Sequence, residues 1–280
     1  MRILEKNVIY DEPDVLLLNA SNHICVDMHT HTKYSDGVNS VPAVLRHAKK
    51  LGIGIAITDH NCINGAIYAK QLIKNKKEFQ GLLLIPGIEV TVKEGYHILA
   101  YFSSFEDLTQ FYIRAIRPFL TRKAINTNTN IIALDMIKVA REYDSLLFLA
   151  HPFVVTGVFV SAKDDPSEVV SEVDGFEVIN ACIPENANLQ AIRWFSNFEH
   201  RNFCAGSDSH FNPLTGSALT LVDINKVKTA KDFIEEIRNK NHRVIGKSVT
   251  TRDLALNHLF FYRLLWNKIR NMKVVKKISS

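Results

Sequence analysis

Residues 26–37 of the chain read VDMHTHTKYSDG, and the interpretation of the whole sequence begins with this stretch. It places His29, His31 and two aspartates, Asp27 and Asp36, in and directly after an apolar run that is typical of a buried strand. So many metal-binding side chains can be a coincidence on a loop, a local metal clip, or the first part of a site that distant segments complete. The remaining sequence favours the last interpretation.

The composition indicates a globular protein. The chain has 280 residues and is 46% hydrophobic, which suffices for one large domain or two small ones. No apolar run approaches the roughly 18 residues that cross a bilayer, and acidic residues near the N-terminus argue against a signal peptide. The cysteines form no CxxC pair, so we expect reduced, mostly buried thiols in a cytoplasmic protein.

The positive charge is concentrated at the C-terminus. The formal net charge is +5, and residues 252–280 contribute +6, which leaves −1 for the other 251 residues. A nucleic-acid surface spread over the body is therefore not indicated. We expect one domain at residues 1–250 and a basic, amphipathic helix or tail at 251–280. This tail is interpreted as a helix packed on the domain, and the alternative is a surface helix that contacts anionic lipid or nucleic acid.

Short strand-like runs alternate with helical patterns along the body. Strands are expected at residues 24–28, 53–58, 82–92, 96–102, 146–150, 175–180, 202–206, 218–224 and 242–246, and helices at 41–52, 63–79, 105–120, 131–143, 187–198 and 230–239. This alternation predicts a mainly parallel α/β architecture. Only residues 93–95 separate two of the strands, which is hairpin spacing. The polar residues 123–130 are expected to form a loop.

Histidines and carboxylates stand at or beside the ends of the expected strands. They are His29, His31, Asp36, His60, Glu89, His97, His151, Asp208 and His210. A strand has a period of two residues, so His29 and His31 share one face, as do Asp208 and His210. The carboxyl ends of parallel strands form one face of a sheet or barrel, where sites are built. We therefore expect all of these residues to converge on one metal site.

The number of ligands points to more than one ion. A catalytic metal keeps about three protein ligands and leaves positions open for water and substrate. The set therefore predicts three divalent ions, and imidazole and carboxylate ligands without thiolate suit zinc, manganese or iron. Such a cluster lowers the pKa of a bridging water and neutralises an oxyanion. The expected reaction is hydrolysis of a phosphate ester by a metal-bridging hydroxide.

Seven motifs, in their order along residues 24–246, resemble the PHP (polymerase and histidinol phosphatase) superfamily. They are HTHTKYSDG, ITDHN, GIEV, HILAYF, AHPF, GFEVIN and GSDSH. The resemblance implies a distorted, TIM-like (β/α)7 barrel with a trinuclear metal centre at the carboxyl ends of the strands. It implies three ligand groups: His29, His31, Glu89 and Asp208; Glu89, His97 and His151, with Glu89 as the bridge; and Asp36, His60 and His210.

Asp36 departs from the pattern of many family members, which place a histidine there. A subgroup of nucleotide-type phosphoesterases has aspartate at this position, so the resemblance points away from a histidinol-phosphate phosphatase.

Five further residues are candidates for supporting the site or binding substrate. Asp27 lies on the same side of its strand as His29 and could orient a histidine. Glu177 either supports the site or is an ordinary structural carboxylate, and Asn180, at the end of the same strand, is a candidate substrate contact. Lys33 and Arg193 are candidates for gripping a phosphate, with solvated surface charge as the alternative.

The leading hypothesis is a metal-dependent phosphoesterase, a hydrolase that acts on a small phosphorylated metabolite or nucleotide. An exonuclease or oligonucleotide phosphatase is the alternative enzyme. A non-catalytic scaffold or binding module is the alternative of another class. Such a module is expected to have lost several metal ligands, whereas all nine are present here.

Overall fold

The computed structural model describes residues 2–5, 7–122, 127–198, 201–250 and 252–253. The strands are β1 (Arg2–Glu5), β2 (Val8–Tyr10), β3 (His23–Thr30), β4 (Gly54–Ile57), β5 (Leu84–Thr91), β6 (His97–Phe102), β7 (Leu120–Arg122), β8 (Thr127–Thr129), β9 (Ser145–Leu149), β10 (Gly175–Asn180), β11 (Asn202–Gly206), β12 (Ala218–Asp223) and β13 (His242–Gly246). The α-helices are α1 (Val15–Ala20), α2 (Val41–Leu51), α3 (Asn64–Asn75), α4 (Phe105–Phe111), α5 (Ala133–Ala140), α6 (Val158–Ser161), α7 (Ser167–Glu172), α8 (Glu185–Phe195) and α9 (Ala230–Arg238).

The expected C-terminal helix lies almost entirely in residues 254–280, outside the described residues. Both the amphipathic tail and the boundary near residue 250 therefore stay predictions.

One mixed sheet organises the chain, in the strand order β1-β2-β13-β12-β3-β4-β5-β6-β9-β10-β11. Five of its ten neighbouring pairs are parallel and five are antiparallel, so the expectation of a mainly parallel sheet is wrong. The expected β5–β6 hairpin is present, and β6 also runs antiparallel to β9. At the other end, β12 lies antiparallel between β3 and β13.

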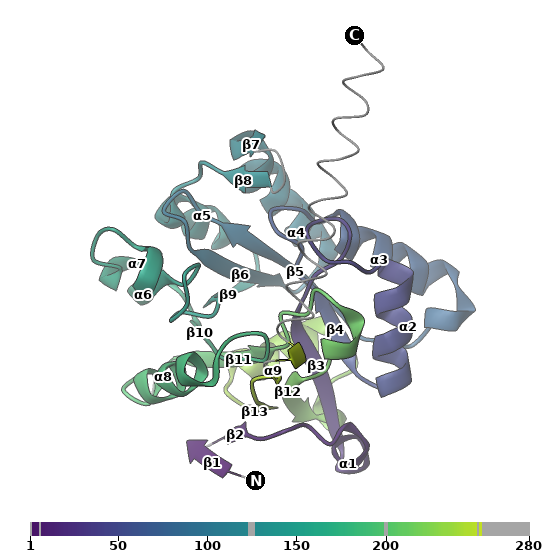
Figure 1. The fold of residues 1–280 in the computed structure, drawn as a ribbon. Coiled ribbons are helices and arrows are strands. Elements are labelled where there is room, and N and C mark those ends of the chain that lie inside the picture. The colour runs from purple at the N-terminus through teal and green to yellow at the C-terminus, as the bar shows by residue number, and fades with distance from the viewer. Residues whose placement is uncertain (1, 6, 123–126, 199–200, 251, 254–280) are drawn as a thin grey trace.

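The sheet curls until its last strand reaches β3. The Asp208 amide donates to the His29 carbonyl at 2.8 Å, and the His31 amide donates to the Ser209 carbonyl at 3.0 Å. The segment after β11 therefore continues alongside β3, as a TIM-like barrel requires. In Figure 1 strands such as β3, β4, β5, β6, β9 and β11 lie around the centre of the molecule, and helices α2, α3, α5 and α8 lie outside them, whereas β1, β7 and β8 lie at the periphery.

The helices follow the sequence pattern at their starts more closely than at their ends. Helix α2 has Pro42 in its first turn and ends before Gly52, which adopts φ +72°. The expected helix at residues 105–120 is shorter, because α4 gives way to a π-helical turn (Tyr112–Ile116) and a 3₁₀ turn (Arg117–Phe119). Pro118 has no backbone N–H with which to continue a helix.

The expected loop at residues 123–130 is only partly a loop. Its last residues include β8, which pairs antiparallel with β7, while residues 123–126 lie outside the described residues.

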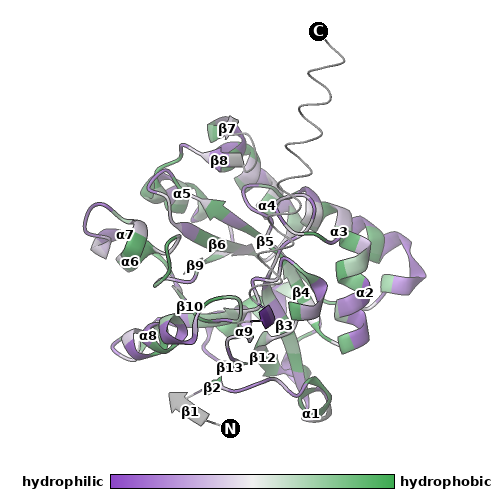
Figure 2. Cartoon of the chain, in the orientation of Figure 1, coloured by the Kyte–Doolittle hydropathy of each residue, from purple (hydrophilic) through white to green (hydrophobic). Residues whose placement is uncertain are grey.

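The central strands are rich in buried apolar residues, and parts of them are coloured green in Figure 2. One buried cluster lies between the strands and the helices. A second includes Met28, Ile85, Leu99, Tyr101 and Phe148. The Tyr101 hydroxyl donates to the Met28 carbonyl at 2.6 Å, directly before His29. A packed core therefore supports the segment that carries the first histidines.

Within the described part of the chain, no helix combines the length and hydrophobicity needed to cross a membrane.

Gly206 should be essential to the contact between β11 and β3. A Cβ atom at this position would lie 2.4 Å from the His29 Cβ and 2.6 Å from the His29 nitrogen. Because backbone atoms cannot move aside cheaply, Gly206→Ala should lower the free energy of unfolding by about 1–3 kcal/mol or more. Gly87→Ala is the control, since its nearest obstacle is the Tyr101 ring at 3.0 Å. Equal melting temperatures for Gly206→Ala and the unmodified protein would contradict this expectation.

Candidate metal centre

The curled sheet brings all nine candidate ligands to one rim. The strands β3, β4, β5, β9 and β11 point their carboxyl ends there, and the antiparallel β6 places its first residue, His97, at the same rim. His29, His31, Glu89, His97 and His151 are buried. Asp36, His60, Asp208 and His210 are partly exposed, so the cluster opens to solvent on their side.

Glu89 lies at the middle of the cluster. Thr91 pairs with His97 across the hairpin, so Glu89 and His97 are diagonal neighbours on one face of the two strands. The Oε1 atom of Glu89 lies 2.9 Å from His97 Nδ1 and 3.2 Å from His151 Nε2. Its Oε2 atom faces other rings, at 3.3 Å from both His29 Nε2 and His31 Nε2 and 2.9 Å from His60 Nδ1. One carboxylate therefore contacts two sets of imidazoles.

The donor atoms of His29, His31 and Glu89 form one close group, and Asp208 lies beside the two histidines. The two histidine Nε2 atoms are 3.1 Å apart, and Asp208 Oδ1 lies 3.0 Å from His31 Nε2 and 3.5 Å from His29 Nε2. Four ligands bound tetrahedrally at zinc-like distances would be about 3.3–3.4 Å from one another. The separations among His29, His31 and Glu89, which are 3.1–3.3 Å, therefore fit a single ion.

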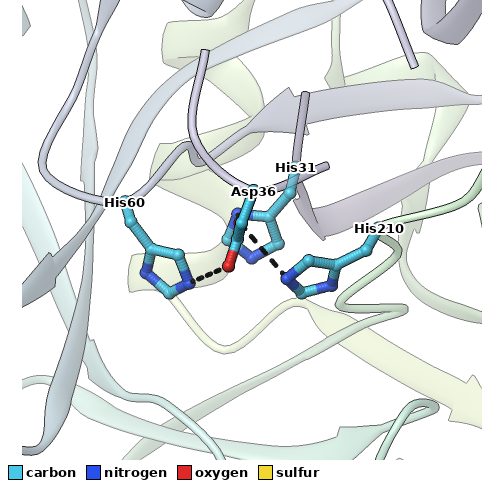
Figure 3. A group of neighbouring side chains, drawn as sticks. All are labelled: His31, Asp36, His60 and His210. Carbon is cyan, nitrogen blue, oxygen red and sulfur yellow. Dashed lines mark ion pairs between the residues drawn. The ribbon is translucent and has the colours of Figure 1, made fainter. Parts of the chain in front are cut away.

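A second group is formed by Asp36, His60 and His210, with His31 beside them (Figure 3). Asp36 Oδ2 lies 3.4 Å from His60 Nε2, and Asp36 Oδ1 lies 3.3 Å from His210 Nε2. His31 Nδ1 is 3.8 Å from Asp36 Oδ1. A third group of close donor atoms consists of His60, Glu89 and His97.

Several buried polar atoms in these groups lack a conventional partner. Within the described residues, Asp36 Oδ1, His60 Nδ1 and Glu89 Oε2 are buried and have no hydrogen bond. Buried polar atoms are normally satisfied, and a cation between imidazole and carboxylate groups would satisfy these three. The donor set therefore fits divalent ions of the zinc, manganese or iron type.

The backbone is strained beside several of these residues. Positive φ angles occur at His151 (+28°) and Asp208 (+53°), and at Asn61 (+50°), directly after His60. Non-glycine residues rarely adopt such angles, and those that do cluster at functional sites.

Burial and the neighbouring charges act in opposite directions on the pKa values of the cluster. Burial opposes the charged form of Glu89, yet His60, His29 and His97 hold its pKa well below the ordinary value. For Asp208, burial is likewise outweighed by His29 and His31, which lower its pKa. Burial lowers the pKa of His210, but Asp36 and Asp208 raise it to about 9. The carboxylates thus favour positive charge at some rings, such as His210, whereas burial lowers the pKa of His31 to about 4 and also lowers that of His97.

Two of the candidate supporting residues contact the cluster directly. Glu177 Oε1 lies 2.9 Å from His29 Nδ1, and Asn180 Nδ2 donates to Asp208 Oδ2 at 3.1 Å. Asp27 has different hydrogen-bond partners from those expected. It accepts from the His29 backbone amide at 3.2 Å, rather than from an imidazole, and from the Ser207 and Gly216 amides.

Lys33 and Arg193 lie apart from the cluster. Both residues are exposed, and in the described ranges neither side chain bonds to a candidate ligand.

Sequence reasoning missed Asp59 as an organiser of the first loop. Its Oδ1 atom accepts from the Thr32 amide and the Ser35 hydroxyl, each at 2.7 Å, and its Oδ2 atom accepts from the Thr32 hydroxyl at 2.7 Å. Burial raises the pKa of Asp59 to about 6. The adjacent Asp59-His60 pair was the available signal, but the pair alone does not show that the aspartate turns toward another loop.

Known proteins share this domain and fold. The model of the PHP domain matches residues 27–203, and that of the PHP-associated region matches residues 185–241. The uncharacterized protein MJ1587 of Methanocaldococcus jannaschii is 41% identical over 81 residues, which is 25% of this chain and 45% of that protein.

Two solved structures extend the likeness to the fold. Endonuclease Q, bound to a 27-mer duplex with an abasic lesion, has a TM-score of 0.62 at 19% identity, with 81% of this chain and 60% of that chain covered. A protein described as a metal-dependent phosphoesterase, from Bifidobacterium adolescentis, has a TM-score of 0.53 at 17% identity, with 81% and 98% covered. At this level of identity the two structures show a shared fold. The PHP-domain model matches more than half of the residues of this chain, and the chain therefore belongs to the PHP family.

Proposed function

We propose that this protein hydrolyses a phosphate ester with three divalent metal ions, and that its curled sheet is a distorted (β/α)7 barrel built for this purpose. The observation that carries the proposal is the convergence of nine imidazole and carboxylate groups, with donor atoms 3.0–3.5 Å apart in the group around His29. No structural role needs such a concentration of buried charge.

The ligands divide among three ions. His29, His31, Glu89 and Asp208 would hold the first, and Glu89, His97 and His151 the second. Asp36, His60 and His210 would hold the third. Glu89 supports this division because its two oxygens face different imidazoles, as a bridging carboxylate does.

Bound divalent ions supply acidity to water, so that hydroxide is available at neutral pH, and positive charge against phosphoryl oxygens. The chain itself keeps one side of the cluster open. The side chains of Asp208 and His210 are 14% and 17% exposed, whereas those of His29 and Glu89 are fully buried. Substrate would therefore approach beside His210 and Asp208.

A small phosphorylated metabolite or nucleotide is the first candidate substrate. An oligonucleotide or nucleic-acid end is the second candidate, for two reasons. The solved neighbour Endonuclease Q was captured on duplex DNA, although this chain spans only 60% of it. In addition, Tyr34 and Tyr68 are 46% and 37% exposed, with ring centroids 6.5 Å apart, and Tyr34 belongs to the loop that carries Asp36. Such rings can stack on bases.

The protein should bind more than one transition-metal ion per chain. We would measure bound metals by elemental analysis, and then screen phosphomonoesters against phosphodiesters with manganese, zinc and iron. Prolonged chelation should abolish hydrolysis, and added divalent metal should restore it. Full activity with one ion or fewer per chain would rule out the trinuclear centre.

Glu89→Gln should be the most damaging single change, because it keeps the side-chain shape but removes the charge between the two sets of imidazoles. Metal content and turnover should fall together, the latter on the order of 100-fold or more. Glu94→Gln is the matched control, since Glu94 lies on the same hairpin and binds the Ala133 amide at 3.1 Å. A Glu89→Gln protein with normal metal content and rate would refute the bridging role.

Tyr34→Ala tests which substrate class is correct. If a base stacks on this ring, kcat/KM for a nucleotide or oligonucleotide ester should fall about 10-fold, while kcat/KM for a small aliphatic phosphoester stays unchanged. Tyr34→Phe should retain the preference, because the ring remains. Equal losses on both substrates would argue against stacking.

A further inference from the structure

Strand β10 contributes none of the nine candidate ligands, although it lies between two strands that lead into them. It pairs in parallel with β9, which precedes His151, and with β11, which precedes Asp208. Its own carboxyl end carries Glu177 and Asn180, and both side chains are completely or almost completely buried. A carboxylate in such a place needs partners that compensate its charge.

Glu177 has partners on both of its oxygens. Oε1 lies 2.9 Å from His29 Nδ1. Oε2 accepts from the His151 amide at 2.9 Å and from Asn180 Nδ2 at 3.0 Å. Asn180 Nδ2 also donates to Asp208 Oδ2 at 3.1 Å. The pair therefore contacts candidate ligands from three separate segments of the chain.

The contact with His29 determines which nitrogen of that ring carries the proton. A carboxylate can only accept, so His29 Nδ1 must be the donor. In the neutral ring, Nε2 then keeps its lone pair, and it faces Glu89 Oε2 at 3.3 Å and His31 Nε2 at 3.1 Å. This is the tautomer that a metal ligand needs.

The other two contacts involve His151 and Asp208, two candidate ligands whose backbones adopt positive φ angles. His151 adopts φ +28°, and its amide is the group that Glu177 Oε2 accepts from. Asp208 adopts φ +53°, and Asn180 occupies its Oδ2 atom while Oδ1 faces His31 Nε2 at 3.0 Å. Each contact leaves the atom that faces the cluster free to bind an ion.

We propose that Glu177, together with Asn180, is a positioning residue of the metal centre: it binds no ion itself, but sets the tautomer of His29 and the placement of His151 and Asp208. This inference rests on the proposed function, because it assumes that the cluster binds metal.

Glu177→Gln separates this role from simple packing. The glutamine amide has one acceptor and one donor end. If its oxygen faces His29 Nδ1, its NH₂ group meets the His151 amide and Asn180 Nδ2, which are donors. If it is turned around, His29 must move its proton to Nε2, which then points at the cluster. Either arrangement disturbs a ligand without changing the volume of the side chain.

The experiment measures zinc affinity by competition with a chromophoric chelator, the tautomer of His29 by long-range ¹H–¹⁵N spectra of the zinc-loaded protein, and the melting temperature of the metal-free protein. Glu177→Gln should lower zinc affinity about 10–100-fold in either arrangement, and the Nδ1-protonated signal of His29 should be lost as well where the amide NH₂ group faces that ring. Glu94→Gln is again the matched control and should change neither. Asn180→Ala should weaken zinc binding as well, but leave the His29 tautomer as it is, because the Glu177 contact remains.

The outcomes separate the two proposals. Wild-type protein that takes up no zinc would overturn the proposed function and this role together. Wild-type protein that binds zinc, with a folded Glu177→Gln variant of equal affinity and unchanged tautomer, would overturn this role alone. If Glu177→Gln does not fold, Asn180→Ala decides: unchanged zinc affinity in that variant overturns the role, and weakened affinity with the tautomer intact supports it.

Discussion

The arrangement at the rim depends on one buried carboxylate that faces five imidazole rings. Glu89 is fully buried, and its two oxygens lie within 3.3 Å of nitrogen atoms on His29, His31, His60, His97 and His151. An isolated charge at this depth would be strongly destabilising. The surrounding rings compensate it, and they come from β3, β4, β6 and the segment after β9, so the requirement to neutralise one side chain involves much of the sheet. The apolar cluster around Tyr101 and Phe148 gives that sheet a rigid base.

The residues of the site could be predicted from sequence because their pattern is local. The histidines and carboxylates follow apolar runs of strand length, and the short spacing before Tyr96 predicted a hairpin. The register of that hairpin, with Thr91 opposite His97, is seen in the structure and brings Glu89 near His97. Confirmed elements such as α2 carry equally local signals, with Pro42 at the start and Gly52 at the end. The structure brings all nine residues together, and their division among three ions stays a prediction.

What could not be predicted depends on contacts between distant segments. Strand direction is one example, because nothing in residues 218–223 shows that β12 lies antiparallel between β3 and β13. Asp27 is another: its position on the strand was clear, but its partners are backbone amides at Ser207 and Gly216, some 180 residues away. Asp59 and Glu177 likewise acquire their partners only in the folded chain.

The meeting of β11 with β3 also has a consequence for how the protein is made. Asp208 and His210, which complete the groups of His29 and His31, are synthesised only after the chain has been extended through β11. A growing chain therefore exposes incomplete clusters of imidazole and carboxylate until the β11 segment docks on β3. If the ions bind as proposed, tight metal uptake reports that the chain from β3 to the segment after β11 has been synthesised and folded, since binding and folding are then one linked process.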